Sequence, residues 1–380
     1  MRVLVTGARG FIAKNLIQHL EEMEGVDVLA FTRADQTSDL EKLLDAVDWV
    51  FHLAGVNRPQ DPKEFESGNK ELTEHLCNAL KRTNKKIPIV YSSSIQAEKE
   101  NEYGLSKLAA EEALLEFNRE TGTPIYIYRL PNVFGKWCRP SYNSVVATFC
   151  YNISHGIPIQ INDPTAPMRL VYVDDVVEEF IGLFEQDYES HGLYKEVAPE
   201  YQITVGDLAD LIGRFKNSRE SLISERVGSG LVRAIYSTYV SYLSPEDFAY
   251  PVQQYGDPRG VFVEMLKTQD SGQFSFFTAH PGVTRGGHYH HSKTEKFLVI
   301  KGTACFRFRH VVSGEYHELH TSGETPQVVE TVPGWTHDVT NTGDEELICM
   351  LWANEIFDRE RPDTYTCALV DEKDVTEEVL

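Results

Sequence analysis

The sequence predicts an α/β protein with a doubly wound parallel sheet, followed by an all-β domain. Up to about residue 240, apolar strand-like runs alternate with helix-like segments, which is typical of a parallel sheet covered by helices on both faces. From about residue 250 the chain consists of short runs rich in Val, Phe, Thr and Gly, separated by turns, a pattern that indicates a sandwich or barrel. With 380 residues, the chain is long enough for two domains that each bury a core.

The individual elements follow from these patterns. The stretch 214–233 is the least clear and is open to a helix or a mobile segment. Ser244-Pro245 and Tyr250-Pro251 interrupt the pattern, so we expect domains at 1–243 and 244–380. In the first domain we expect strands at 3–5, 26–31, 49–53, 89–92 and 125–130 and helices at 11–20 and 103–117, and in the second domain strands at 274–277, 296–300, 304–308, 327–332 and 347–352.

The formal net charge of −22 comes from 58 acidic and 36 basic residues. A chain this acidic is unlike proteins that bind nucleic acid or anionic membranes through a basic face, so we expect neither partner. The six cysteines include no C-x-x-C pair, which favours reduced, structural thiols over a disulfide framework. The sequence begins directly with a strand and turn instead of a secretory leader, and no apolar run reaches the ~18 residues of a membrane span. We therefore expect a cytoplasmic protein.

A glycine-rich turn follows the first predicted strand. Gly7, Gly10 and Ala13 form a G-x-x-G-x-x-A pattern that opens the first helix, where small residues let a pyrophosphate approach unpaired N–H groups. The same residues also permit tight strand–helix packing, but their position favours a Rossmann-like nucleotide site. At the end of the second strand, Arg33 stands where an NAD site would use a carboxylate. With Arg9 it suits a 2′-phosphate, so we expect NADPH over NADH, a solvated surface arginine being the alternative.

Tyr103 and Lys107 are four residues apart on a predicted helix and therefore share a face. An ammonium group there lowers the pKa of a tyrosine by stabilising the phenolate, and the tyrosine is then able to protonate the oxygen of a carbonyl that receives hydride. The cluster Ser92-Ser93-Ser94 ends the preceding strand and offers a hydroxyl to the same oxygen. With the glycine turn, this set predicts a carbonyl reductase.

Residues 1 to about 240 resemble the extended short-chain dehydrogenase/reductases that act on nucleotide sugars. The resemblance implies Ser94, Tyr103 and Lys107 as the catalytic set, and Asn132 and Arg169 along the sugar-nucleotide diphosphate. The stretch between Arg33 and Trp49 is too short for the usual third strand and helix, so we expect an abbreviated adenine side. The matching motifs are Thr6-Gly7-x-x-Gly10-Phe11-Ile12, Phe51-His52-Leu53-Ala54, Tyr103-x-x-x-Lys107, Arg129-x-Pro131-Asn132-Val133-Phe134-Gly135 and Arg169-x-x-Tyr172-Val173-Asp174-Asp175. The expected cofactor-binding residues are Gly7, Arg9, Gly10, Phe11, Ile12, Arg33, Leu53, Ala54, Tyr103 and Lys107.

A second constellation lies in the C-terminal part. His288 and His290 are two apart on a predicted strand and point to one face, Glu295 follows a short turn, and His337 comes from a later strand. Three imidazoles and a carboxylate suit zinc, iron, nickel or manganese; the sequence does not select among them, and zinc is our working expectation. A solvent-facing pair is the alternative for the two alternating histidines alone. The spacing between Gly282 and Gly302 is similar to that of a cupin, a jelly-roll fold.

The segment Asp257 to Glu264 and the segment Pro281 to His288 are similar to those of the deoxysugar 3,5-epimerases. Those epimerases are generally metal-free and use a histidine base at the position of His288. His288 is therefore open to two roles, and we rank metal ligation first, which leaves the proton-transfer base unassigned. Arg259, Arg285 and His337 are the expected substrate-side residues.

Three further motifs are Phe134-Gly135-Lys136-Trp137-Cys138, Ser237-Thr238-Tyr239 and Glu295-Lys296-Phe297-Leu298-Val299. With them, the chain resembles over essentially its whole length the bifunctional capsule and O-antigen enzymes of the CapF/WbjC type. The resemblance implies C3 epimerisation of a UDP-2-acetamido-2,6-dideoxy-4-ketohexose in the cupin, then NADPH-dependent reduction at C4. The product would be UDP-2-acetamido-2,6-dideoxy-L-talose, on the route to UDP-N-acetyl-L-fucosamine, and we expect a homodimer. Two alternatives remain, in which the cupin is a non-catalytic, metal-stabilised dimerisation module or a ligand sensor for the reductase.

Overall fold

The computed structural model describes residues 1–83, 85–185, 193–257, 260–263, 265–268, 272–355 and 360–369. Contacts divide the chain into two compact units, 1–144 with 167–203 and 145–166 with everything from residue 204 onward. Each unit is described by itself. The boundary predicted at 243/244 coincides with the change from helix to strand along the chain, and as a domain limit it stays a prediction.

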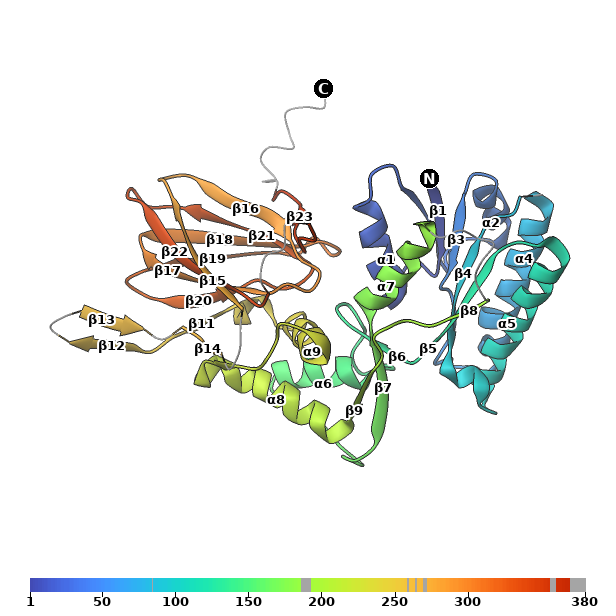
Figure 1. The fold of residues 1–380 in the computed structure, drawn as a ribbon, viewed down its shortest axis with the longest axis horizontal. Coiled ribbons are helices and arrows are strands. Elements are labelled where there is room, and N and C mark those ends of the chain that lie inside the picture. Colours follow the sequence, from blue (N-terminus) through green and yellow to red (C-terminus); the bar gives the residue numbers. More distant parts are fainter. Residues whose placement is uncertain are drawn as a thin grey trace, which may run out of the picture. The chain divides into compact units, whose positions relative to one another are not determined.

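The first unit is built on a six-stranded sheet in the order β2-β1-β3-β4-β5-β8, in which every pairing is parallel (Figure 1). Residues 32–48 are all described and contain a helix but no strand, so β2 ends the sheet and the abbreviated adenine side is confirmed. The strands are β1 (Arg2–Thr6), β2 (Asp27–Phe31), β3 (Trp49–His52), β4 (Ile89–Ser94), β5 (Ile125–Leu130) and β8 (Tyr194–Lys195).

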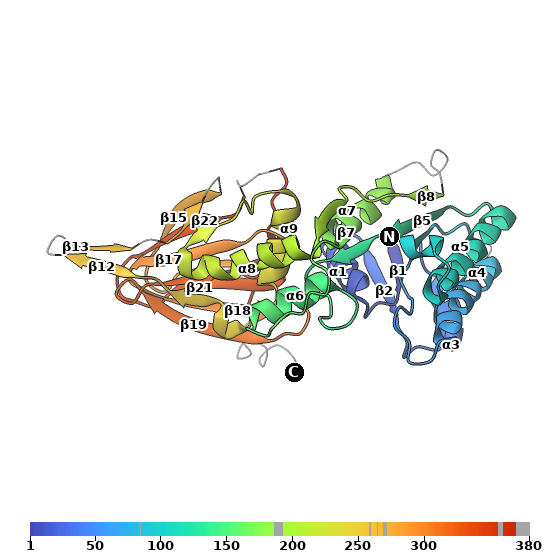
Figure 2. The same ribbon diagram turned by 90° about the horizontal axis from the view of Figure 1, so that it is seen from below.

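Helices cover both faces of this sheet, because alternate side chains of each strand point to opposite sides. Val3 and Val5 of β1 share a core with α1 (Phe11–Glu21) and α7 (Val173–Gly182). Leu4 shares the opposite core with the other helices. These are α2 (Thr37–Leu44), α4 (Leu72–Thr83) and α5 (Glu102–Thr121). Figure 2 shows α4 and α5 on the side of the sheet away from α1 and α7.

Smaller elements complete the first unit and shape its sites. A three-stranded sheet in the order β6-β7-β9 carries the residues that follow β5. Before α4 lie a short helix and a π-helical turn, a distortion that is frequent at functional sites. The bounds are β6 (Asn132–Phe134), β7 (Pro167–Tyr172), β9 (Tyr201–Thr204), α3 (Lys63–Phe65) and the π-helical turn η1 (Glu66–Glu71).

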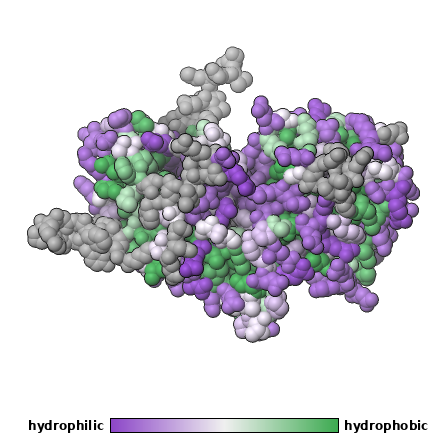
Figure 3. Space-filling view, viewed as in Figure 1, coloured by the Kyte–Doolittle hydropathy of each residue, from purple (hydrophilic) through white to green (hydrophobic). Residues whose placement is uncertain are grey.

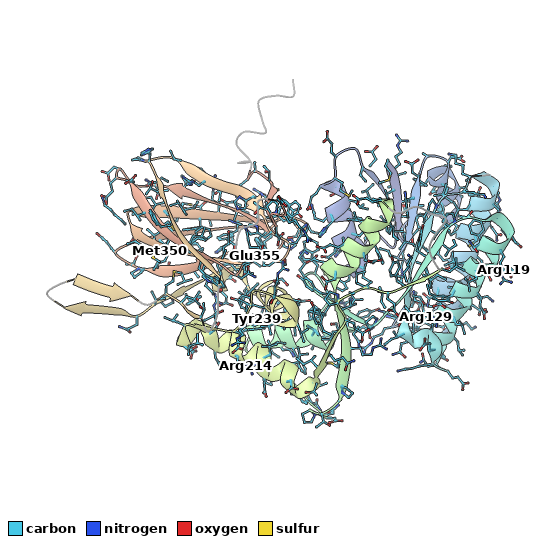
Figure 4. The ribbon with its side chains drawn as sticks, in the orientation of Figure 1. Arg119, Arg129, Arg214, Tyr239, Met350 and Glu355 are labelled. Carbon is cyan, nitrogen blue, oxygen red and sulfur yellow. The ribbon has the colours of Figure 1, made fainter. Side chains whose placement is uncertain are left out.

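The second unit contains three helices that pack on one another, α6 (Val145–Ser154), α8 (Val205–Ser221) and α9 (Gly230–Val240). Tyr239 of α9, labelled in Figure 4, is buried and packs near Phe215 of α8 with ring centroids 6.0 Å apart. The stretch 214–233, which the sequence left open, therefore consists mainly of the end of α8 and the start of α9.

Most of the rest of the second unit is antiparallel, with two five-stranded sheets in the orders β11-β20-β17-β22-β15 and β19-β18-β21-β16-β23. Along β18, Ala304, Phe306 and Phe308 are buried, as expected for a strand with one face on a core. The fold class is confirmed: a parallel α/β sheet is followed by antiparallel sheets. The strands are β11 (Ala249–Pro251), β12 (Gln254–Asp257), β13 (Gly260–Val263), β14 (Lys267–Thr268), β15 (Gln273–Ala279), β16 (Thr284–Tyr289), β17 (Glu295–Lys301), β18 (Thr303–His310), β19 (Tyr316–Ser322), β20 (Gln327–Glu330), β21 (Trp335–Asn341), β22 (Leu347–Ala353) and β23 (Tyr365–Thr366), and β14 pairs with β10 (Ile223–Ser224).

A buried ionic cluster fastens the helices to the antiparallel sheets within the second unit. Glu330 of β20 accepts from Lys296 of β17 and pairs with Arg219 of α8 at 3.0 Å. Tyr236 of α9 donates to the same carboxylate at 3.1 Å. Although burial opposes its ionisation, Lys296 and Arg219 keep the pKa of Glu330 below its usual value. A carboxylate buried in this way depends on its cations, so the cluster fixes the helices against these strands.

Polar residues cover much of the face in Figure 3, with apolar residues among them in separate groups. Among the described residues, no helix combines the length and the apolar character needed to cross a bilayer.

Candidate active sites

The glycine turn of the first unit has the geometry of an anion-binding site. Gly7 has a φ of 67°, and the N–H of Gly10 donates to its carbonyl oxygen at 2.7 Å. A Cβ on Gly7 would lie 2.6 Å from Cα of Ala54, so only glycine lets the loop after β3 approach this closely. Helix α1 begins with no side-chain cap and no acidic residue in its first turn. The N–H groups of Phe11 and Ile12 therefore fit the pyrophosphate of a dinucleotide.

Arg9 and Arg33 lie after neighbouring strands, since Thr6 of β1 pairs with Phe31 of β2. Both arginines are exposed. Hydrogen bonds from Thr32 lower the pKa of Asp35, and the charge of Arg9 adds to this effect. The carboxylate is held by the N–H and hydroxyl of Thr32 at 2.7 and 2.8 Å. The turns after β1 and β2 thus carry two cations, Arg9 and Arg33, and the nearby carboxylate of Asp35 already has hydrogen-bond partners in its own turn.

Tyr103 and Ser94 are brought together at the start of α5. Asn101 caps this helix by accepting from the N–H of Gly104 at 2.8 Å. A Cβ on Gly104 would lie 2.1 Å from the carbonyl oxygen of Gln96, so this glycine lets the first turn of α5 pack on the turn after β4. Ser94 ends β4 and hydrogen-bonds with the hydroxyl of Tyr103. The ring of Tyr103 lies 5.9 Å from that of Phe65.

The ionisation of Tyr103 and Lys107 differs from what the sequence-based argument predicted. Burial raises the pKa of Tyr103, and the Ser94 bond only partly offsets it. Burial lowers the pKa of Lys107 to about 8, although Glu111 favours its charged form. The Lys107 ammonium donates to the carbonyl oxygen of Ser92 at 2.9 Å and lies over the ring of Tyr91. A tyrosine that keeps its proton is suited to protonate a carbonyl oxygen.

Asn69 is a buried residue of this site that the sequence patterns did not reveal. Its amide donates to the hydroxyl of Ser106 at 2.8 Å, and its oxygen accepts from the N–H of Val56 at 2.7 Å. A Cβ on Gly55 would lie 3.0 Å from the Asn69 oxygen and 3.1 Å from Nζ of Lys107. Asn69 therefore ties the loop after β3 to α5 beside Lys107. It lies in the π-helical turn η1, which the sequence analysis did not predict.

The remaining predicted residues of the first unit lie as follows. Leu53 and Ala54 directly follow β3, where the N–H of Ala54 donates to Thr6 Oγ1 at 3.2 Å. Asn132 of β6 donates to the backbone oxygen of Arg169 on β7 at 3.0 Å, so these two residues are brought together. The guanidinium of Arg169 already pairs with both oxygens of Glu200, at 2.6 and 2.7 Å, a partner that the sequence patterns did not reveal.

Arg129 of β5, labelled in Figure 4, forms an ion pair with the fully buried carboxylate of Glu111. It donates two parallel bonds to Glu111, with the shortest at 2.6 Å. Ser93 donates to the same carboxylate. Ser93, the second serine of the cluster that ends β4, is therefore already bonded to Glu111, while Ser94 is the one that reaches Tyr103.

The four predicted metal ligands of the second unit converge. One ligand atom from each of His288, His290, Glu295 and His337 lies within 4.8 Å of the others. Nε2 of His290 is 3.1 Å from Oε2 of Glu295, and Nε2 of His337 is 3.5 Å from the same oxygen. His290, Glu295 and His337 are buried, and His288 is half-buried.

A bulge in β16 sets this arrangement. The register with β21 shifts between Gly286 and His288, which places His288 directly opposite His337. Gly286 and Gly287 have φ values of 104° and 78°, and a Cβ on Gly286 would lie 2.9 Å from the backbone of Asp338. Bulges commonly re-aim side chains next to active sites. The sequence predicted the four ligands but not this bulge.

The protonation of the cluster fits a bound cation. Nδ1 of His290 lies 2.5 Å from the backbone oxygen of Asp363, which is only an acceptor, so Nδ1 carries a proton. In a neutral imidazole Nε2 then presents a lone pair to Glu295. Burial, followed by the charges of His337 and His290, lowers the pKa of His288 to about 3, and burial also lowers the pKa of His337. Burial opposes ionisation of Glu295, but His290 and His337 hold its pKa well below the usual value. Three imidazoles around a carboxylate are a donor set for a divalent metal.

The structure describes one of the two predicted substrate arginines of this unit. Arg285 of β16 is exposed, lies over the ring of Phe277 and donates to the backbone oxygen of Thr278 at 3.1 Å. These contacts hold it toward β15. Arg259 lies outside the described residues, as does Glu264 at the end of the epimerase-like opening.

Comparison with known proteins gives two family matches. The NAD dependent epimerase/dehydratase family matches residues 3–194, and a polysaccharide biosynthesis C-terminal domain matches residues 255–365. The chain is 59% identical to the UDP-2-acetamido-2,6-beta-L-arabino-hexul-4-ose reductase of Pseudomonas aeruginosa, over 97% of this chain and 99% of that protein. It is 24% identical to the dTDP-4-dehydro-6-deoxyglucose reductase of Escherichia coli, over 58% of this chain and 83% of that protein.

Solved structures give the same picture. The capsular polysaccharide assembling protein CapF from Staphylococcus aureus has 42% identity and a TM-score of 0.67, covering 97% of this chain and all of that chain. A UDP-glucuronic acid 4-epimerase from Bacillus cereus in complex with NAD has 21% identity and a TM-score of 0.52, covering 57% of this chain and 84% of that chain. At that identity the second likeness supports the fold alone.

Proposed function

Because the chain belongs to the NAD dependent epimerase/dehydratase family and matches a nucleotide-sugar reductase along its length, we propose that it is a bifunctional enzyme of UDP-linked 4-ketosugars. The substrate is a UDP-2-acetamido-2,6-dideoxy-4-ketohexose. The second unit epimerises C3, and the first unit reduces C4 with NADPH to give UDP-2-acetamido-2,6-dideoxy-L-talose, on the route to UDP-N-acetyl-L-fucosamine. From the resemblance to enzymes of the CapF/WbjC type, we also propose that the protein is cytoplasmic and forms a homodimer.

The observation that carries this proposal is the presence of two complete sets of side chains in one chain. Tyr103, Ser94 and Lys107 form a proton-donating set beside a dinucleotide-type turn. His288, His290, Glu295 and His337 form a metal-type set on β16, the loop that follows it, β17 and β21. A 4-ketosugar is a substrate for both, because its carbonyl accepts hydride at C4 and also acidifies the neighbouring C3–H.

In the reduction, Tyr103 transfers its hydroxyl proton to the C4 oxygen, and Ser94 hydrogen-bonds to the same oxygen. Lys107 holds its ammonium beneath the site through Ser92 and offsets the negative charge that Tyr103 leaves behind. The first turn of α1 binds the pyrophosphate, and Arg9 with Arg33 bind the 2′-phosphate. Bound NADPH supplies the hydride that C4 receives.

In the epimerisation, a base removes the C3 proton, and reprotonation of the enolate from the opposite face inverts the centre. A divalent metal, for which we propose zinc, would be held by His288, His290, Glu295 and His337 and would supply Lewis-acid stabilisation of a developing oxyanion. His288 is counted as a ligand, since its ring lies 4.8 Å from that of His337 within the cluster. Arg259 and Arg285 are proposed to bind substrate, and the base stays unassigned.

One observation favours a different role for the second unit. Three of the four ligand residues are buried, and closed metal sites are typically structural. In that case the second unit would be a metal-stabilised module for dimerisation or ligand sensing, and the enzyme would be a 4-reductase alone. Incubating the protein with the UDP-4-ketosugar and NADPH, and determining the C3 configuration of the alcohol by NMR, tests the proposal. Retention of the starting C3 configuration would support the reductase alone.

Arg33→Asp is expected to shift the cofactor preference from NADPH toward NADH. A carboxylate repels the 2′-phosphate and accepts a hydrogen bond from a free 2′-hydroxyl. The ratio of kcat/KM for the two cofactors measures the shift, for which about 10-fold corresponds to about 1.4 kcal/mol. Arg58→Asp, a change of the same charge in the loop after β3, is the matched control and should leave the ratio unchanged. An unchanged ratio in Arg33→Asp would remove this residue from the site.

A further inference from the structure

A short segment near the end of the described chain, 363–367, lies beside the strand and loop that carry His288 and His290. Its strand β23 pairs with β16, with Thr366 opposite His288 and Tyr365 opposite Tyr289. The N–H of Cys367 donates to the backbone oxygen of Gly287 at 2.8 Å. The segment therefore extends the sheet next to the bulge that aims His288.

The carboxylate of Asp363 binds the loop between β16 and β17 through four hydrogen bonds. Oδ1 accepts from the N–H of His291 at 2.9 Å. Oδ2 accepts from the N–H and hydroxyl of Ser292 at 2.7 and 3.0 Å and from the N–H of Lys293 at 2.6 Å. Three consecutive backbone N–H groups thus converge on one side chain, which fixes the course of the chain from His290 to Glu295.

The backbone of Asp363 acts on His290 itself. Its carbonyl oxygen lies 2.5 Å from Nδ1 and accepts the proton there, so the lone pair of a neutral ring is on Nε2, the nitrogen 3.1 Å from Glu295. Hydrogen bonds of this kind orient metal-ligating histidines and raise their basicity. The position of this carbonyl depends on the carboxylate of the same residue, because that carboxylate anchors the segment to the loop.

The next residue, Thr364, contacts the carboxylate ligand Glu295 indirectly, through Lys293. Nζ of Lys293 donates to Thr364 Oγ1 at 2.9 Å and lies 3.5 Å from Oε1 of Glu295. The other oxygen of Glu295, Oε2, faces His290 and His337. One segment therefore orients both a histidine and the carboxylate of the cluster.

We propose that Asp363 is a positioning residue of the metal site. By binding the 291–293 loop, it holds its own carbonyl oxygen on His290 Nδ1 and so selects the tautomer that offers Nε2 to a divalent cation. This inference rests on the metal site proposed above, and it adds a residue that lies far along the chain from all four ligands.

The test uses full-length protein stripped of metal and reloaded with Zn²⁺ or Co²⁺. Asp363→Asn keeps the size of the side chain, but in either orientation its NH₂ group faces an N–H donor of the loop. We expect the affinity for Zn²⁺, measured by competition with a chelating dye, to fall about 10–100-fold. The visible spectrum of the Co²⁺-loaded variant should also change, because it reports the ligand geometry.

Asp163→Asn is the matched control. Asp163 belongs to the same unit and accepts from the N–H and hydroxyl of Thr165 at 2.9 and 2.7 Å, so this variant also loses turn contacts but should bind both ions as the wild type does. Should Asp363→Asn precipitate, Ser292→Ala removes one of the four bonds and should weaken Zn²⁺ binding by a smaller factor. Wild-type affinity and spectrum in the soluble variant would overturn the positioning role. A wild-type protein that binds neither ion would defeat the metal site itself, and the inference with it.

Discussion

Tyr103→Phe should lower the rate of C4 reduction by about 10²–10⁴-fold while leaving cofactor binding nearly unchanged. The substitution removes the hydroxyl that hydrogen-bonds with Ser94, and with it the proton that the C4 oxygen needs. The ring and its contact with Phe65 at 5.9 Å remain, so the first turn of α5 keeps its packing. NADPH oxidation with the UDP-4-ketosugar gives the rate, and fluorescence titration of NADPH gives the binding.

Tyr128→Phe is the matched control for this prediction. Tyr128 lies on β5 of the same sheet, and its hydroxyl donates to Glu179 at 3.0 Å. This variant also loses one buried tyrosine hydroxyl bond, yet it should reduce the ketosugar at the wild-type rate. A wild-type rate in Tyr103→Phe would rule out Tyr103 as the proton donor. Exchange of the C3 proton should survive in both variants, because it belongs to the other unit.

His290→Ala should abolish tight metal binding. The residue supplies Nε2 beside Glu295, and a lost ligand should weaken affinity by more than the ~10–100-fold typical of outer-shell changes. Thermal stability should fall as well, because a metal at 100 times its Kd stabilises a folded protein by about 2.7 kcal/mol. Elemental analysis and the thermal shift on adding Zn²⁺ measure the two effects.

His280→Ala is the matched control, since His280 is an exposed histidine in the turn after β15 and should leave metal content unchanged. Full metal occupancy in His290→Ala would contradict the ligand assignment. A metal-poor variant that still exchanges the C3 proton at the wild-type rate would show that the metal is structural, as the burial of three ligand residues also allows.

The sequence predicted those features that depend on local pattern. The inner strands of the parallel sheet, β1, β3, β4 and β5, are buried on both faces and appear as apolar runs. Tyr103 and Lys107 are about one helical turn apart. The four metal ligands were predictable because His288, near the end of one strand, is followed two residues later by His290, and Glu295 begins the next strand. The absence of a strand between Arg33 and Trp49 was predictable from the short length of that stretch alone.

Other features depend on contacts between distant segments, and the sequence patterns therefore did not reveal them. Asn69 reaches Val56 and Ser106, and Glu200 reaches Arg169 across the β7–β9 sheet. Asp363 reaches His290 only because β23 returns to β16. The raised pKa of Tyr103 likewise results from burial, which residue spacing does not report.

The central claim is that one carbonyl serves both reactions, and solvent deuterium exchange at C3 tests it most directly. Hydride addition removes the carbonyl that acidifies C3–H, so epimerisation must precede reduction. Incubated in D₂O without NADPH, the full-length protein should incorporate deuterium at C3 of the UDP-4-ketosugar, and it should incorporate none into the sugar nucleotide already reduced at C4. A ketosugar that is readily reduced with NADPH but shows no C3 exchange would contradict the account and leave the second unit without a catalytic role.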